Sequence, residues 1–183
     1  AYTLSLHDAL PIYDTYEPLP NKNIDTGMGL ERLVSVIQDT PTNFETDLFL
    51  PIIRKIETLT DVKYDTAGEQ QMSFKVIADH IRAVTFAVAD GALPSNEGRG
   101  YILRRLIRRS VLHARRLKIT DNFLARLVPA VIEVMGDFYT DLAPEKDFVQ
   151  RILTTEEQRF AATIEEGQAL LDEVIGSLRE AGQ

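Results

Sequence analysis

The sequence predicts a mainly α-helical protein whose N-terminal end is not helical. Along most of the 183 residues, apolar side chains recur every three or four positions, which is the period of a helix packed on one side. Prolines and glycines separate these periodic stretches. With 44% apolar and 26% charged residues, the chain has the composition of an ordinary globular protein with a sizeable core.

The first 40 residues combine an irregular stretch with one predicted helix. Residues 1–23 show no clear period, and three prolines there favour irregular structure or a short strand. The small-residue turn Asn23–Gly29 leads into an apolar pattern that predicts a helix lasting until about Asp39, and Pro41 ends it. A domain boundary is expected near Pro41 or near Gly68.

Five further helices are predicted in the rest of the chain. They are expected at residues 46–59, 73–89, 101–117, 123–139 and about 145–180. A long loop separates the second of these helices from the third, and it holds three glycines, a proline, a serine and an asparagine. The last helix is acidic and keeps a near-heptad spacing of apolar residues.

Residue types exclude several kinds of site. The chain has no cysteine, and His7, His80 and His113 are scattered, so we expect no metal site within it. We interpret His80 and His113 as surface histidines that have no serine or cysteine nearby to activate. No apolar run is long enough for a membrane span, and the N-terminus lacks an export signal. We therefore expect no membrane partner and take the cytoplasm as the default compartment.

One predicted helix is strongly basic although the net charge is −8. Eight of the 20 Lys and Arg lie between Arg99 and Lys118, and none of the 28 Asp and Glu does. At about 100° per residue, six arginines fall within an arc of about 140°: Arg104, Arg105, Arg108, Arg109, Arg115 and Arg116. Charge alone leaves two interpretations open, namely contact with nucleic-acid phosphates or a solvated face paired with the acidic last helix.

Two punctuated segments offer further candidate residues. In the loop 90–100, Ser95, Asn96 and Arg99 can donate to base edges or to a nucleic-acid backbone, but taken alone the loop is better explained as a connection in which glycines make turns. In the segment 25–32, paired glycines permit close approach of a ligand to the backbone, although the bare pattern favours a plain turn.

Three stretches together resemble one family. They are "NIDTGMGLERL" (23–33), "IADHIRAVTFAVADGALPSNEGRGYILRRLIRRSVLHARRL" (77–117) and "TTEEQRFAATIEEG" (154–167). In this order and at about this spacing they resemble the alanyl-tRNA synthetases, over roughly residues 16–180. The resemblance implies a helical domain that recognises the tRNA acceptor stem, preceded by the C-terminal strand and helix of a class II α+β catalytic core.

The resemblance also implies a division of the chain. Residues 13–40 would be the remnant of the catalytic core, and residues 41–183 the helical tRNA-recognition domain. Residues 1–12 do not fit the family. Our hypothesis is that they are a translated sequencing adapter joined to a truncated reading frame.

Site residues carried over from the family fall into two groups. Asp25 would hold the α-amino group of alanine beside Gly27, and Gly29 and Arg32 would bind ATP. The residues expected to bind tRNA are Asn96, which would read the G·U wobble pair of the acceptor stem, and Arg99, Arg104, Arg105, Arg108 and Arg109, which would hold its backbone. No catalytic residue is assigned.

The resemblance finally implies a function for the full-length protein. It would attach alanine to tRNA(Ala) in an ATP-dependent reaction with Mg²⁺, and this segment would mainly bind the acceptor stem. Because the first two class II signature motifs are absent, the segment alone is expected to be inactive. Two alternatives are a non-catalytic RNA-binding helical module and a helical interaction protein whose basic helix docks on the acidic one.

Overall fold

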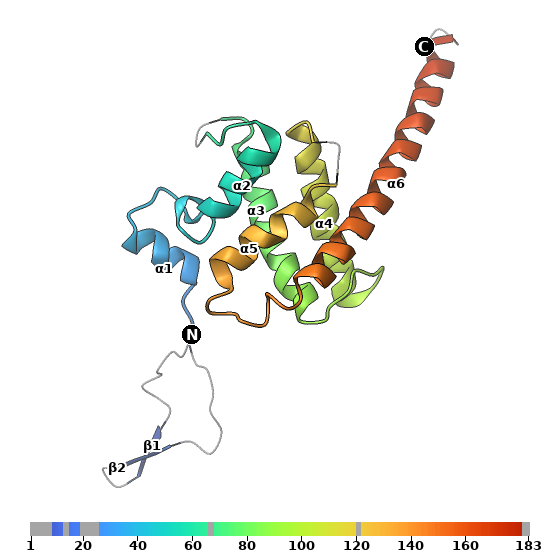
Figure 1. Cartoon of the computed structure of the whole chain (residues 1–183). Coiled ribbons are helices and arrows are strands. Elements are labelled where there is room, and N and C mark those ends of the chain that lie inside the picture. The colour runs from blue at the N-terminus through green and yellow to red at the C-terminus, as the bar shows by residue number, and fades with distance from the viewer. Residues whose placement is uncertain (1–8, 13–14, 19–25, 66–67, 120–121, 181–183) are drawn as a thin grey trace. The chain divides into compact units, whose positions relative to one another are not determined.

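The computed structural model describes residues 9–12, 15–18, 26–65, 68–119 and 122–180 (Figure 1). The chain divides into two compact units, Ala1–Thr46 and Asp47–Gln183, and each is described here by itself.

The described part of the first unit contains two strands, one helix and one helical turn. Strand β1 (Ala9–Ile12) pairs antiparallel with β2 (Thr15–Pro18), in the region expected to be irregular or a short strand. Helix α1 (Leu30–Ile37) begins where the sequence predicts and ends just before Asp39, whose φ of 50° leaves the helical region. The 3₁₀ turn η1 (Asn43–Glu45) follows. No residue of α1 is buried, although the helix carries a pronounced apolar side.

All regular secondary structure in the described residues of the second unit is helical, which confirms the prediction of a mainly α fold. Its elements are α2 (Leu50–Thr60), α3 (Gln71–Ala89), α4 (Gly98–Arg116), η2 (Leu124–Leu127), α5 (Val128–Met135) and α6 (Lys146–Glu180). Helices α3 and α4 pack side by side, and α2, α5 and the first part of α6 close the bundle around them (Figure 1). The largest fully buried side chains include Phe74, Ile77, Ile81, Ile107, Phe123 and Leu153.

Two sequence predictions fail at helix boundaries. The single helix predicted over 123–139 is wrong, because the 3₁₀ turn η2 comes first and α5 then runs only from Val128 to Met135. Pro129 lacks a backbone N–H and therefore fits only the first turn of a helix, so α5 must begin there. Helix α4 begins at Gly98, three residues before the predicted start at Tyr101.

Helix α6 has a packed part and an exposed part. Val149 and Leu153 are buried in the bundle, whereas Leu170, Leu171 and Val174 are 63%, 56% and 46% exposed. Figure 1 shows the C-terminal part of α6 extending away from the other helices of its unit. The helix is therefore held by tertiary contacts only over its first turns.

Two adjacent polar contacts fix the packed part of α6 to η2. The buried carboxylate of Glu157 accepts hydrogen bonds from the backbone N–H groups of Phe123 (3.1 Å) and Leu124 (3.0 Å). About two helical turns earlier on α6, the Gln150 side-chain amide donates to the Ala125 carbonyl at 2.8 Å. Burial raises the pKa of Glu157 to about 7, against the opposing effect of the backbone donors.

The raised pKa of Glu157 predicts a pH-dependent stability. The folded state holds the proton more tightly than the unfolded chain, so the stabilisation is complete below about pH 4.5 and is lost as pH rises towards about 7. At about 1.4 kcal/mol per pKa unit, the loss amounts to about 3 kcal/mol. Urea denaturation from about pH 5 to about pH 8 should show a flatter stability profile for Glu157→Gln than for the unchanged chain.

The matched control is Glu166→Gln, which removes an exposed carboxylate from the same helix. It should leave the profile of the unchanged chain intact. Identical pH slopes for Glu157→Gln and the unchanged chain would show that Glu157 is not the group that titrates.

Candidate nucleic-acid interface

Helix α4 exposes its arginines to solvent because its apolar side is buried in the core. Leu103, Ile107 and Ala114 are buried at 6%, 1% and 4% exposure, and they orient the helix. On the opposite side Arg105, Arg108 and Arg109 are exposed, whereas Arg104 is half-buried. The amphipathic pattern of one helix therefore produces a basic surface without any contribution from distant segments.

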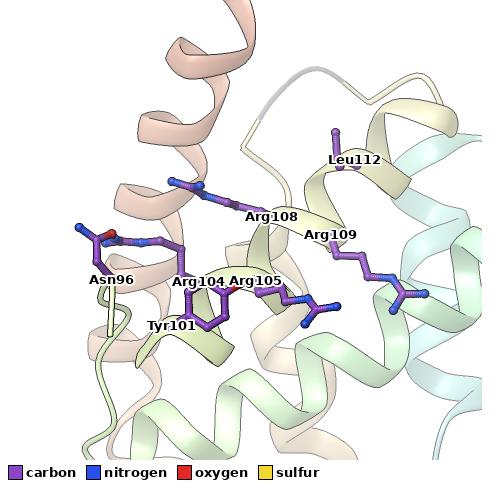
Figure 2. Close-up of a pocket in the computed structure, with 7 residues that line it drawn as sticks. All are labelled: Asn96, Tyr101, Arg104, Arg105, Arg108, Arg109 and Leu112. Carbon is purple, nitrogen blue, oxygen red and sulfur yellow. The ribbon is translucent and has the colours of Figure 1, made fainter. Parts of the chain in front are cut away.

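A surface pocket of about 450 Å³ lies on this side of α4. Its lining residues come from α4 and the preceding loop: Asn96, Tyr101, Arg104, Arg105, Arg108, Arg109 and Leu112 (Figure 2). The structure thus brings together Asn96 and four of the five arginines that the sequence predicts to bind tRNA. Arg99, the fifth, is exposed in the first turn of α4 and does not line the pocket.

The pocket arginines differ in their partners. Arg104 donates from Nε and from one terminal nitrogen to the two carboxylate oxygens of Glu156 on α6, both at 3.0 Å. Its other terminal nitrogen donates to Oδ1 of Asn96. The Glu156 carboxylate raises the pKa of Arg104 further above its usual range. Arg104 is therefore engaged inside the protein, as the interpretation of a basic face paired with the last helix predicts.

The remaining pocket arginines are directed differently. Arg108 extends toward α6, where its guanidinium lies 5.1 Å from the centre of the Phe160 ring. Arg105 and Arg109 point away from α6 (Figure 2). The interpretation of a basic face paired with the last helix therefore holds only for Arg104, which pairs with a carboxylate of α6, whereas Arg105 and Arg109 face solvent.

The loop before α4 is tightly packed at Gly100. A Cβ atom at this position would collide with Oγ of Ser95 and with the carbonyl oxygen of Leu93, and it would lie 2.7 Å from the Ser95 nitrogen. Gly91 and Gly98 adopt positive φ angles of 86° and 56°, as turn glycines do. Gly100 instead lets the loop that carries Asn96 lie directly against α4, a role that no local sequence pattern reveals.

The prediction of surface histidines is wrong. His80 and His113 are only 8% and 7% exposed, because α3 packs closely against α4. Nδ1 of His113 lies 3.0 Å from Oγ of Ser73, and Nδ1 of His80 lies 2.8 Å from a carboxylate oxygen of Asp79. Burial, and then the charge of Arg116, lower the pKa of His113. The expectation that no serine lies nearby also fails, since residues 40 positions apart in sequence meet across two helices.

The residues predicted to bind alanine and ATP lie in the first unit. Asp25 falls outside the described residues. Gly27 and Gly29 are exposed in the turn before α1, and nothing lies within 4 Å of a Cβ built at Gly27. Arg32 is exposed in the first turn of α1, and its side chain lies 3.7 Å from a Cβ built at Gly29.

Two other kinds of site, a metal centre and a membrane span, are absent from the part of the chain that the structure describes. No group of three or more His, Cys, Asp or Glu side chains there is placed to hold a metal ion. None of the described helices is both long enough and apolar enough to span a bilayer.

Comparisons with known proteins point to one family. The model of the tRNA synthetases class II (A) matches residues 9–183. The alanine–tRNA ligase of Enterococcus faecalis is 61% identical over 169 residues, and that of Listeria innocua is 56% identical over the same length. The alanine–tRNA ligase of Geobacillus kaustophilus is 58% identical over 168 residues. Each match covers 92% of this chain but only 19% of the relative, so the chain spans about a fifth of these proteins.

The packing at Gly100 predicts that Gly100→Ala destabilises the second unit by about 1–3 kcal/mol, because the loop must move off α4. Gly167→Ala is the matched control, since nothing lies within 4 Å of a Cβ there and α6 is exposed at that point. Alanine should instead stabilise α6 by up to about 1 kcal/mol. Thermal and urea unfolding should give opposite signs for the two variants, and equal signs would refute the close approach at Gly100.

Proposed function

We propose that the full-length protein is an alanine–tRNA ligase, because the chain belongs to the class II (A) tRNA synthetases. We also propose that this segment mainly binds the acceptor stem of tRNA(Ala). The full-length protein would join alanine to tRNA(Ala) at the expense of ATP. As an enzyme of translation it is expected to act in the cytoplasm.

A single observation supports the RNA-binding role most directly: the exposed Asn96 lies in one pocket with Arg105, Arg108 and Arg109. Arginine side chains offer forked, permanently charged donors that suit phosphate oxygens. A carboxamide offers both a donor and an acceptor, as a base edge requires. The pocket therefore combines groups that position a nucleic-acid backbone with one group that can read a base.

The shape of duplex RNA favours this arrangement. The minor groove of A-form RNA is wide and shallow, so a side chain on a loop at the start of a helix can reach a base pair there. Phosphates on either side of the groove would meet the guanidinium groups that follow along α4. The net charge of −8 does not oppose this, because an RNA backbone at the pocket meets mainly the local cations.

We further propose that α1 and the turn before it contribute to alanine and ATP binding in the full-length protein. Asp25 and Gly27 would face alanine, and Gly29 and Arg32 would face ATP. Gly27 and Gly29 leave open backbone that a ligand can approach, and Arg32 is exposed beside them. We assign no ligand for Mg²⁺ among the described residues, because no cluster of carboxylates suits it there.

The proposed domain division follows from the same features. Residues 13–40 would belong to the catalytic core and residues 41–183 to the helical domain. Of residues 1–12, which do not resemble the family's own sequence, residues 9–12 fall within the range matched by the family model. The apolar residues of α1 support this assignment. Leu30, Val36 and Ile37 are 53%, 78% and 73% exposed, as expected of a helix whose packing partner is a larger core.

For the chain on its own, a non-catalytic RNA-binding module is the second candidate function. This candidate is favoured because the whole lining of the pocket comes from the second unit. RNA binding therefore requires nothing from α1 or from the glycine-rich turn.

Salt-dependent binding of an acceptor-stem hairpin tests the basic surface. The dissociation constant should rise steeply with salt, and Arg105→Ala or Arg109→Ala should each weaken binding and reduce the salt slope by about 1. Lys55→Ala, on the surface of α2, is the matched control and should change neither quantity. Binding that ignores salt would exclude the phosphate contacts.

A second experiment tests the role of Asn96. The unchanged chain should prefer a hairpin with a G·U pair over one with G·C, and Asn96→Ala should reduce this preference by up to about tenfold while leaving most of the affinity for the G·C hairpin. Competition binding with the two hairpins measures the ratio. Equal loss for both hairpins would show that Asn96 does not read the pair.

A further inference from the structure

We infer that Arg104 is a positioning residue for Asn96, and that Glu156 of α6 keeps it in this role. The inference rests on the proposed function, because it concerns how the base-reading side chain is held. It assigns Arg104 a task different from that of the neighbouring arginines, which would meet phosphates.

The geometry of Arg104 leaves its guanidinium group little freedom. Two of its nitrogens are 3.0 Å from the two oxygens of Glu156, a bidentate pair that fixes both the position and the plane of the group. The remaining terminal nitrogen is then directed at Oδ1 of Asn96. Because the guanidinium group is planar and two of its nitrogens are fixed, its remaining terminal nitrogen can donate in one direction only.

Burial strengthens this constraint. The side chains of Arg104 and Glu156 are 17% and 8% exposed, so solvent screens the pair far less than it screens a surface salt bridge. The other partner of Glu156 is Arg159, which is 68% exposed and lies 3.4 Å away. Arg104 is therefore the stronger of the two described partners.

The residue next to Glu156 anchors the helix itself. Glu157 is bound to the backbone of η2, as described above, so α6 is attached at adjacent positions to η2 and to α4. Glu156 is consequently part of a fixed support rather than of a flexible chain. The position of Asn96 is in this way linked to the packed part of α6, although 60 positions of sequence separate Asn96 from Glu156.

The consequence for RNA recognition is preorganisation. Asn96 lies on an exposed loop, where an unsupported carboxamide would sample several rotamers. A guanidinium only donates hydrogen bonds, so it selects the orientation in which Oδ1 faces Arg104. The amide NH₂ and the second lone pair of Oδ1 stay available to a base pair. Binding of RNA then costs less conformational entropy of the Asn96 side chain. The resulting gain in affinity appears as a stronger preference for the G·U hairpin over the G·C hairpin.

Glu156→Gln tests this inference, because it keeps the shape of the side chain and removes its charge. The preference for the G·U hairpin over the G·C hairpin should fall by about fivefold or more. Affinity for the G·C hairpin should stay the same or rise, since the guanidinium becomes available to phosphate. Arg104→Lys, which keeps the charge but loses the fork, should lower the preference in the same way.

Two controls separate positioning from a general structural effect. Arg159→Gln removes the other partner of Glu156 and should leave the preference unchanged. In an Asn96→Ala background, Glu156→Gln should cause no additional loss of preference, because the residue through which it acts is gone.

The outcomes distinguish this inference from the proposed function. If the unchanged chain prefers G·U and both Glu156→Gln and Arg104→Lys keep that preference, the positioning role is refuted and the function of Asn96 stands. A further loss caused by Glu156→Gln in the Asn96→Ala background would also refute it. If the unchanged chain shows no preference between the hairpins, the proposed function fails and this inference fails with it.

Discussion

The packing of α4 against its neighbours is the interaction on which the rest of the structure depends. Its apolar side, with Leu103 and Ile107, is buried against the bundle, and this alone determines which way the arginines face. The helix also carries the loop with Asn96 at its start. A single amphipathic element therefore sets the orientation of the core, the basic surface and the candidate base-reading residue together.

The basic surface also shows how electrostatic repulsion between neighbouring arginines is reduced within the protein. The six arginines on one side of α4 repel each other, and a nearby carboxylate relieves part of that repulsion. Glu156 takes this role for Arg104, whereas the guanidinium of Arg108 lies over the ring of Phe160. Arg105 and Arg109 remain directed at solvent. Neighbouring arginines thus differ in their contacts because different side chains of α6 lie opposite each one.

Sequence periodicity located the helices well, because amphipathic spacing is a local property of the chain. Apart from one missed local signal, it failed where the decisive contact joins residues distant in sequence. Pro129 was a local signal that the prediction of one long helix overlooked. The burial of His80 and His113 required knowledge of how α3 meets α4, and the pairing of Arg104 with Glu156 joins residues 52 positions apart. Residue type and spacing therefore indicated the basic face, and the family resemblance proposed the individual site residues, but neither could tell which arginines are paired within the protein.

The exposed C-terminal part of α6 has a thermodynamic consequence of its own. Beyond Gly167 the helix depends on its intrinsic propensity, which Gly167 and Gly176 both lower by about 1 kcal/mol each relative to alanine. Short helices without tertiary contacts are marginal in water. We therefore expect the backbone amides there to exchange with solvent through local fraying, at a free energy well below that of global unfolding, so that the two parts of α6 differ in local stability.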